Sequence, residues 1–255
     1  MNQEDFQKLG SIFVYSDKMA WFDFGPDHPY KPERANKTYD LCTRYGVIKQ
    51  PWMQILEPKP IAEHLLMLFH ESDYIRILKD ASAGEVRPAM LEHGLGSEDN
   101  PIVLGIYEWF RRAAGGTYTA MDRIMNSDAL VAFNPLGGFH HGMPGHAEGF
   151  CYINDIVIAI MDALNKLPEQ RIAYVDFDAH HGNGVQEPFY ADPRVLFISL
   201  HETGRTLYPW SGSEKEIGNG EGEGFTVNFP LEPGSDDDVY DFVLDDVVFP
   251  LLRSF

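Results

Sequence analysis

Residues 171–178, RIAYVDFD, decide the fold, together with AHHGNG at 179–184. The first stretch predicts a buried strand, from which Asp176, Asp178 and His180 project on one side, because alternate strand residues share a face. Polar side chains on a buried strand are costly unless they pair or bind a metal. Carboxylate and neutral imidazole are ordinary zinc ligands. The stretch therefore predicts a metal site at a strand end, with a hydrogen-bonded strand terminus as the alternative.

Strands and helices alternate on both sides of this segment. Further strands are predicted at residues 11–15, 129–134, 195–200 and 225–229. Helices are predicted at residues 32–45, 60–69 and 72–78. Another is predicted from Asn100-Pro101 to Gly115-Gly116, and a separate one follows it through Met125. The last two are predicted at 156–167, after an Asn154 cap, and from Asp236, after a Ser235 cap, where Pro250 should kink or end the helix. This order predicts one α/β domain over residues 1–255, a three-layer α/β/α arrangement with a central parallel sheet. Ligands of such sheets bind at the carboxyl ends of strands.

Composition narrows the functional classes. The chain has 255 residues, a net charge of −19 and two cysteines, Cys42 and Cys151. The charge argues against direct nucleic-acid binding and suits a cationic substrate, although a charged surface also serves solubility. Two cysteines make neither a disulfide framework nor a cysteine metal cage, which predicts a reducing, cytoplasmic setting. No apolar run is long enough for a membrane span, and the N-terminal MNQEDFQKLG lacks a signal-peptide layout.

Two further motifs carry polar or aromatic side chains. Residues 137–142 are GGFHHG, and the adjacent His140 and His141 in a glycine-rich loop suit proton transfer to and from a reacting group. A surface or metal-binding histidine pair is the alternative. Residues 149–155 are GFCYIND, in which Phe150 lines a narrow apolar channel or packs in the core.

The ordered motifs GGFHHG, GFCYINDI, YVDFDAHHGNG, ISLHETG and VNFPL resemble those of histone deacetylases and their bacterial relatives. The similarity runs from His28 to the end of the chain, and HETGR with Met143-Pro144 is most similar to the acetoin-utilisation type. The resemblance implies an arginase/deacetylase-like fold. It also implies removal of acetyl groups from lysine side chains or related amines, through attack of a zinc-bound water with histidine as general base and acid.

The resemblance also implies roles for single residues around the reaction. Asp178 and His180 match two of the three ligands of zinc, or of iron in the same ligand set. His141 matches the general base and acid, and His140 its companion. Asp176 matches the carboxylate that orients His140.

Ion and substrate contacts follow from the same resemblance. A structural potassium ion is expected to be bound by Asp176, Ser199 and Leu200 with the carbonyls of Asp178 and His180. A second monovalent ion is expected at the carbonyls of Phe189, Asp192, Val195 and Phe225. The acyl-lysine tunnel is expected to involve Gly149, Phe150 and Tyr208, with Asp99 at its rim and Arg34 in a channel behind the metal.

The sequence departs from the family pattern at three places. Asn183 stands where many members have the Asp behind the general base. Trp210 replaces the first glycine of the Pro-Gly-Thr-Gly turn, which reshapes the tunnel mouth. The third metal ligand, an Asp, and the tyrosine that stabilises the oxyanion have no counterpart in the 255 residues. We therefore expect a domain that is incomplete at its C-terminus and associates with a complementing segment or forms an oligomer.

Two other functions remain open. A ureohydrolase of the arginase type needs two manganese ions and another Asp two residues after the histidine, where this chain has Gly182. The second alternative is that the chain by itself is a non-catalytic fragment, which needs the segment with the remaining metal ligand.

Overall fold

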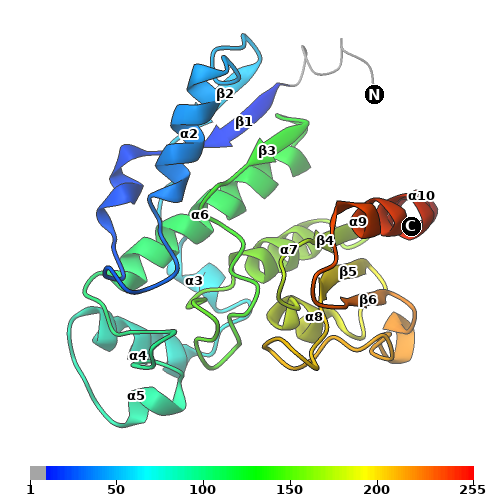
Figure 1. Ribbon diagram of the computed structural model, residues 1–255. Coiled ribbons are helices and arrows are strands. Elements are labelled where there is room, and N and C mark those ends of the chain that lie inside the picture. The colour runs from blue at the N-terminus through cyan, green and yellow to red at the C-terminus, as the bar shows by residue number, and fades with distance from the viewer. Residues whose placement is uncertain (1–9) are drawn as a thin grey trace. The chain divides into compact units, whose positions relative to one another are not determined.

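The computed structural model describes residues 10–255, which divide into two compact units, one through Asn165 and one from Lys166 (Figure 1). Residues 1–9 lie outside the described residues. They make up most of the N-terminal segment for which the sequence predicts no signal peptide. Within residues 10–255, no helix has the length and apolarity that crossing a bilayer requires. The prediction of a single domain over residues 1–255 stays a prediction.

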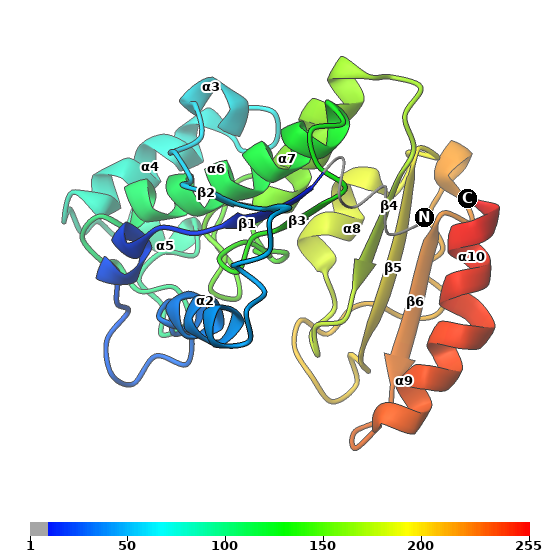
Figure 2. The ribbon, with the colours of Figure 1, turned by 90° about the horizontal axis from the view of Figure 1, so that it is seen from above.

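The first unit is built on a three-stranded parallel sheet of order β2-β1-β3. Its strands are β1 (Ser11–Val14), β2 (Met53–Leu56) and β3 (Val131–Phe133). Its helices are η1 (Asp17–Trp21), α2 (Arg34–Arg44), α3 (Glu63–Leu66), α4 (Ser72–Ser82), α5 (Ala89–Glu92), α6 (Ile106–Met125) and α7 (Asp155–Lys166). The central strand β1 is buried on both faces. Its Ile12 and Val14 pack with Ala120 of α6, while its Phe13 meets Tyr39 of α2 edge-on, so that one helix covers each face (Figure 2).

Helix α6 corrects the sequence prediction of two helices separated at Gly115-Gly116. It is continuous and begins at Ile106, after Gly105 with its φ of 79°, rather than at Asn100-Pro101. A Cβ on Gly115 would lie 1.8 Å from the carbonyl oxygen of Lys59, and one on Gly116 would lie 2.9 Å from the Asn134 amide. These glycines therefore allow another segment to approach the helix closely and do not end it.

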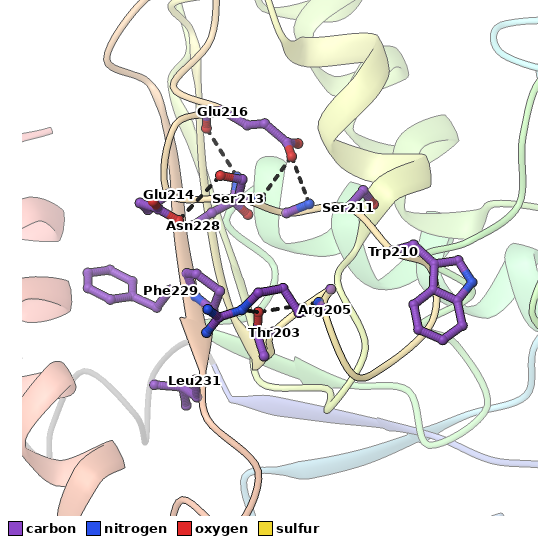
Figure 3. A pocket seen from close by; sticks show the side chains of 13 residues that line it. Thr203, Arg205, Trp210, Ser211, Ser213, Glu214, Glu216, Asn228, Phe229 and Leu231 are labelled. Atoms are coloured by element: carbon purple, nitrogen blue, oxygen red, sulfur yellow. Dashed lines mark hydrogen bonds between the residues drawn. The ribbon is translucent and has the colours of Figure 1, made fainter.

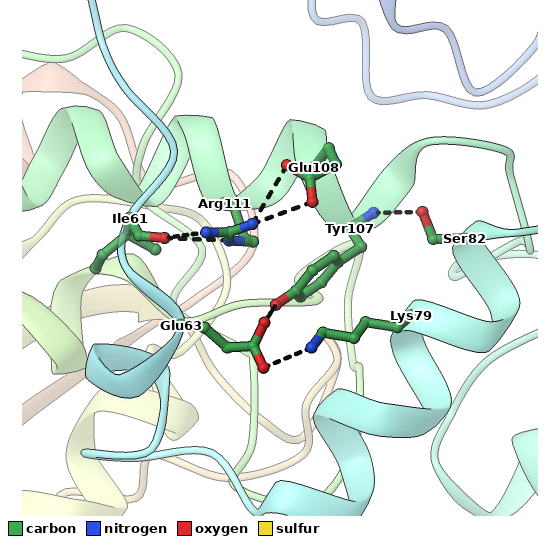
Figure 4. Close-up of polar contacts among 7 residues, drawn as sticks. All are labelled: Ile61, Glu63, Lys79, Ser82, Tyr107, Glu108 and Arg111. Carbon is green, nitrogen blue, oxygen red and sulfur yellow. Dashed lines mark hydrogen bonds and ion pairs between the residues drawn. The ribbon is translucent and has the colours of Figure 1, made fainter.

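A polar cluster fixes α6 against the segment before α3 and against α4 (Figure 4). Arg111 donates to the carbonyl of Ile61 at 2.7 Å, and the Tyr107 hydroxyl donates to Glu63 at 3.0 Å. Lys79 of α4 pairs with the same Glu63 at 2.5 Å. Burial is the main cause that raises the pKa of Tyr107, so its hydroxyl remains a donor at neutral pH.

The second unit has another three-stranded parallel sheet, of order β4-β5-β6. Its elements are β4 (Ile172–Asp176), α8 (Asn183–Phe189), β5 (Val195–Glu202), η2 (Gly220–Gly222), β6 (Thr226–Leu231), α9 (Asp237–Val243), the π-helical segment η3 (Leu244–Val248) and α10 (Phe249–Ser254). Helix α8 covers one face, and the run from α9 to α10 covers the other (Figure 2). Val243 and Val248 of this run pack on Leu196, Ile198 and Leu200 of the central strand.

Parallel sheets flanked by helices confirm the predicted α/β class. Several local predictions were wrong. The helix expected at 60–69 is reduced to α3, and β2, α5 and α8 were not predicted. Ser235 donates to the carbonyl of Glu232 and does not cap α9, whose first flanking residue is Asp236. Pro250 lies in the first turn of α10, directly after the π-helical segment, and the helix continues through it.

Candidate active site

The loop that carries the two histidines of the first unit is held by the start of α7. Gly138 and Phe139 donate their backbone N–H groups to the carboxylate of Asp155, the latter at 2.8 Å. Asn154 donates to the carbonyl of Gly142 at 3.0 Å and accepts from the N–H of Val157 at 3.1 Å. The predicted Asn154 cap is thus confirmed, and the same residue anchors the loop. Burial raises the pKa of Asp155 against the opposing effect of these hydrogen bonds.

The predicted general base and its companion lie together in this loop. His140 and His141 are 6% and 4% exposed, and their ring centroids are 4.1 Å apart. The His141 ring rests on the backbone of Gly149, where a Cβ would lie 2.5 Å from the ring carbon Cδ2. Gly149 has a φ of 51° and is followed by Phe150 at 69°. Glycine is therefore required at 149 by both space and conformation.

His28 joins two of the predicted substrate contacts. Its Nδ1 accepts from the N–H of Tyr30 at 3.2 Å, so its Nε2 carries the proton and donates to the carbonyl of Asp99 at 3.1 Å. The Phe150 ring meets the same imidazole edge-on at 4.8 Å between centroids. The backbone of Asp99, whose carboxylate is exposed, and the half-buried ring of Phe150 therefore both contact one histidine. From the sequence alone, His28 only marks where the family similarity begins.

Phe150 also packs against the main core of this unit, so the two predicted roles of its ring, core and channel wall, are compatible. Arg34 is exposed at the start of α2, and its guanidinium carbon lies 4.8 Å above the Tyr30 ring. The hydroxyl of Tyr30 is buried without a hydrogen-bond partner among residues 10–255. The Tyr30 ring lies 6.0 Å from that of Phe139, next to His140 in the histidine loop.

The buried His70 predicts how the stability of the first unit responds to acid. Nε2 of His70 accepts from the N–H of Asn154, so Nδ1 carries the proton and donates to the carbonyl of Met143 at 3.0 Å. Burial lowers the pKa of His70 from 6.5 to about 4. Between these values the unfolded chain binds a proton that the folded chain does not, so stability is lost as the pH falls. We expect this site to remove about 3 kcal/mol of unfolding free energy from pH 7 to pH 4.

Urea unfolding of the wild type and of His70→Gln across this pH range measures the effect. The variant is expected to be less stable at pH 7 but to show a shallower pH dependence. His201 also has a lowered pKa, chiefly from burial, and contributes in the same direction in both proteins. Parallel pH profiles for wild type and variant would contradict the assignment to His70.

The second unit places the predicted metal ligands just beyond β4. This strand ends at Asp176, earlier than predicted, and Asp178 and His180 lie in the following turn. Asp176 accepts from the Tyr174 hydroxyl at 2.6 Å and from the N–H of Asp178 at 2.9 Å. Asp178 Oδ1 accepts from the N–H of His180 at 2.8 Å and lies 2.9 Å from Nδ1 of the same residue. The turn therefore brings the carboxylate and the imidazole together.

This pair fits two ligands of a divalent metal. The two side chains are 50% and 39% exposed, so an ion can reach them. Carboxylate oxygen and neutral imidazole nitrogen are the donor types that zinc prefers. Within residues 10–255, no three His, Cys, Asp or Glu side chains are grouped so that they could hold a metal ion. The acids of the 236–246 segment are exposed on the last helical run, as the sequence predicts.

The residues of the predicted potassium site lie on neighbouring strands. Asp176 is the register partner of Ser199, whose buried hydroxyl lies 2.8 Å from Nδ1 of His201. Leu200 is fully buried in the same strand. Carbonyls of the second predicted ion site take part in backbone hydrogen bonds. The carbonyls of Phe189, Asp192 and Phe225 already accept from the N–H groups of Asp192, Val195 and Phe197, respectively. Both ion sites stay predictions.

Tyr208, the predicted tunnel wall of this unit, lies beside the candidate metal ligands. Its ring centroid is 6.1 Å from that of His180. Trp210 follows with a φ of 65° and is 67% exposed. Asn183 begins α8 and donates its N–H to the carbonyl of His181. His140 and His141, the predicted partners of Asp176 and Asn183, belong to the first unit.

Comparisons with known proteins agree with these motifs. The family model described as "Histone deacetylase domain" matches residues 28–255. The chain is 41% identical over 231 residues to acetoin utilization protein AcuC of Bacillus subtilis, covering 90% of this chain and 59% of that protein. It is 35% identical over 245 residues to type-1 histone deacetylase 1 of Dictyostelium discoideum, covering 95% and 48%.

A solved structure of a histone deacetylase homologue from Aquifex aeolicus matches with a TM-score of 0.87 and 31% identity, covering 96% of this chain and 66% of that one. The chain thus spans about half to two thirds of the length of these proteins. The family model covers most of the chain, and the chain belongs to the histone deacetylase family.

Proposed function

We propose that this chain supplies most of the active site of a zinc-dependent deacetylase that removes acetyl groups from lysine side chains or related amines. The observation that carries the proposal is the meeting of Asp178 and His180 at the carboxyl end of a parallel strand. This is where ligands bind in sheets of this class. Membership of the histone deacetylase family supports the same reaction class.

Zinc, when bound by Asp178, His180 and a third ligand, supplies a Lewis acid that polarises an amide carbonyl and lowers the pKa of water. His141 acts as general base toward the attacking water and then as general acid toward the leaving amine. His140, whose ring centroid lies 4.1 Å from that of His141, is its companion in proton transfer. The small loop anchored by Asn154 and Asp155 keeps both rings in place before substrate arrives.

The aromatic side chains suit a lysine stem. Phe150 and Tyr208 each offer an apolar face to the methylene groups, and the carboxylate of Asp99 is exposed to accept N–H groups of a substrate backbone. A solved histone deacetylase homologue that resembles this chain was determined in complex with SAHA. The net charge of −19 favours cationic substrates such as lysine-rich peptides or polyamines. A cytoplasmic location and an oligomer or complementing segment stay predictions from the sequence.

A substrate panel separates this function from its alternatives. The form that carries the segment by which the relatives exceed this chain is incubated with an acetyl-lysine peptide, an acetylpolyamine and a guanidinium substrate of ureohydrolases, and acetate and urea are measured. We expect acetate from the first two and no urea, because Gly182 offers no ligand for a second metal. Urea production would favour the arginase-type function instead. Binding of acetyl-lysine peptide without any turnover, in a form that carries the segment by which the relatives exceed this chain, would favour a non-catalytic role.

A further inference from the structure

The loop between β5 and β6 lies next to a candidate metal ligand and also lines a cavity. Residues 203–216 carry Tyr208 next to His180 and also line a cavity of about 720 Å³ (Figure 3). Figure 3 shows Trp210 at one end of this cavity and Glu214 at the other, with Arg205 between them. The position of the loop therefore sets where Tyr208 and Trp210 stand beside the candidate metal ligands.

Two buried imidazole rings, those of His181 and His201, contact this loop. Nδ1 of His181 lies 2.8 Å from the Ser211 hydroxyl, and Nε2 of His201 donates to the carbonyl of Gly212 at 2.8 Å. The two rings are 4.8 Å apart and at most 1% exposed. A Cβ on Gly212, whose φ is 83°, would lie 2.4 Å from the His201 ring nitrogen. The loop therefore rests directly on the rings, with no space for a side chain between.

Glu216 closes the loop on itself and ties it to α8. One carboxylate oxygen accepts from the N–H groups of Gly212 and Ser213, at 3.0 and 2.8 Å. The other accepts from Nε2 of Gln186 at 2.7 Å. Burial raises the pKa of Glu216, but the hydrogen bonds from Ser213 and Gln186 more than offset this and leave it below its usual range. The group is thus a carboxylate at neutral pH and can only accept.

Because the Glu216 carboxylate can only accept, it sets the direction of the hydrogen bonds among Gln186, His181 and Asn228. The amide nitrogen of Gln186 must face Glu216, so its oxygen faces inward and accepts from Asn228 at 2.7 Å and from Nε2 of His181 at 3.0 Å. His181 therefore carries a proton on Nε2, and its Nδ1 lies 2.8 Å from the Ser211 hydroxyl. The opposite oxygen of Asn228 is buried without a partner among the described residues, which shows that the cluster imposes this orientation. His181 lies in the loop before α8, Gln186 in α8 and Asn228 in β6.

We propose that Glu216 is a positioning residue that, through Gln186 and His181, holds Tyr208 and Trp210 at the mouth of the acyl-lysine site. The inference rests on the proposed deacetylase function for its meaning in catalysis. The carboxylate of Glu216 hydrogen-bonds to the loop backbone and to Gln186, so it acts on substrate only through the loop.

Reversing the polarity of the cluster tests the proposal. In Glu216→Gln, an amide donor faces the amide donor of Gln186, and no rotation of either amide satisfies all the partners. We expect KM for an acetyl-lysine peptide to rise about tenfold with kcat and zinc content little changed, the size of effect expected when a charge-assisted hydrogen bond is lost. In the double variant Glu216→Gln/Gln186→Glu, the carboxylate at position 186 accepts from the new amide at position 216, from Asn228 and from His181. We expect this variant to recover KM.

Glu214→Gln is the matched control, because Glu214 is exposed in the same loop and accepts from the Ser213 hydroxyl rather than from the buried cluster. It should leave KM unchanged. A readout without substrate is the ¹⁹F spectrum of protein labelled with fluorotryptophan, in which the Trp210 resonance is assigned from Trp210→Phe. That resonance should shift or broaden in Glu216→Gln and return in the double variant.

These outcomes separate the positioning role from the proposed function. If the wild-type form that carries the additional segment of the relatives releases no acetate, the deacetylase function is refuted, while the Trp210 resonance still tests the cluster. Unchanged KM and an unchanged Trp210 resonance in Glu216→Gln would overturn the proposal, as would a double variant as impaired as the single one. If Glu216→Gln does not fold, recovery of folding by the double variant supports the proposed role of Glu216. A double variant that also fails to fold overturns that role.

Discussion

His141→Ala is expected to keep its metal and to lose about 10²- to 10⁴-fold in kcat, the contribution typical of a general acid–base residue. The His141 ring is buried against Gly149 and next to His140, and it lies outside the turn that carries Asp178 and His180. Its removal should therefore stop proton transfer without releasing the ion. The measurement is kcat for an acetyl-lysine peptide, together with zinc per chain, in the catalytically active form of the protein.

His146→Ala is the control for this variant. His146 lies in the same segment, has a side chain 45% exposed and pairs with Glu148 at 3.1 Å. Its replacement should leave kcat within about twofold, as expected for a surface position away from the reaction. If His141→Ala loses its zinc, His141 would be reassigned as a ligand, and the proton-transfer role would pass to another residue.

Asp178→Asn is expected to abolish both metal retention and activity. An amide oxygen is a much poorer zinc ligand than a carboxylate, and the change also weakens the contact that orients His180. Loss of an outer-shell partner alone costs about 10- to 100-fold in metal affinity, so loss of a direct ligand should exceed 100-fold. Zinc affinity is measured by competition with a chromophoric chelator.

Asp241→Asn provides the comparison, since Asp241 is an exposed carboxylate on α9 of the same unit. It should bind zinc as the wild type does. A variant Asp178→Asn with unchanged zinc affinity would remove Asp178 from the ligand set and, with it, the observation on which the proposed function rests.

The sequence predicted those parts of the fold that depend on local chemistry. The Asn154 cap is set by a side chain that reaches three residues along the chain, and β4, β5 and β6 are short runs of branched and aromatic residues. Helix α6 shows the limit. A glycine pair disfavours a helix interior, but the role of Gly115 is decided by the carbonyl of Lys59, which is distant in sequence. Helix α8 was missed because Gly184 and Pro188 are poor helix formers within a seven-residue element.

In the candidate site, too, some residues could be predicted from the sequence and others could not. The motifs located His140, His141, Asp178 and His180 because their residue types carry the chemistry themselves. Glu216 carried no such signal, since a glutamate in a polar loop is ordinarily solvated. Its role follows only from the tertiary contacts that bring Gln186 of α8 against it. His28 likewise acquires a role through the backbone of Asp99, far away in the sequence.

The central claim is that Asp178 and His180 provide two ligands of a single catalytic zinc in a deacetylase. The most direct test measures zinc per chain and acetate release from an acetyl-lysine peptide before chelation, after chelation and after zinc is restored. It compares the 255-residue chain with a form that carries the additional segment present in its relatives. The account predicts that the longer form holds one zinc and loses and regains activity with it, while the 255-residue chain is much less active. A longer form that holds one zinc yet cleaves no acyl-lysine, acylpolyamine or small amide would contradict it, as would full activity of the 255-residue chain alone.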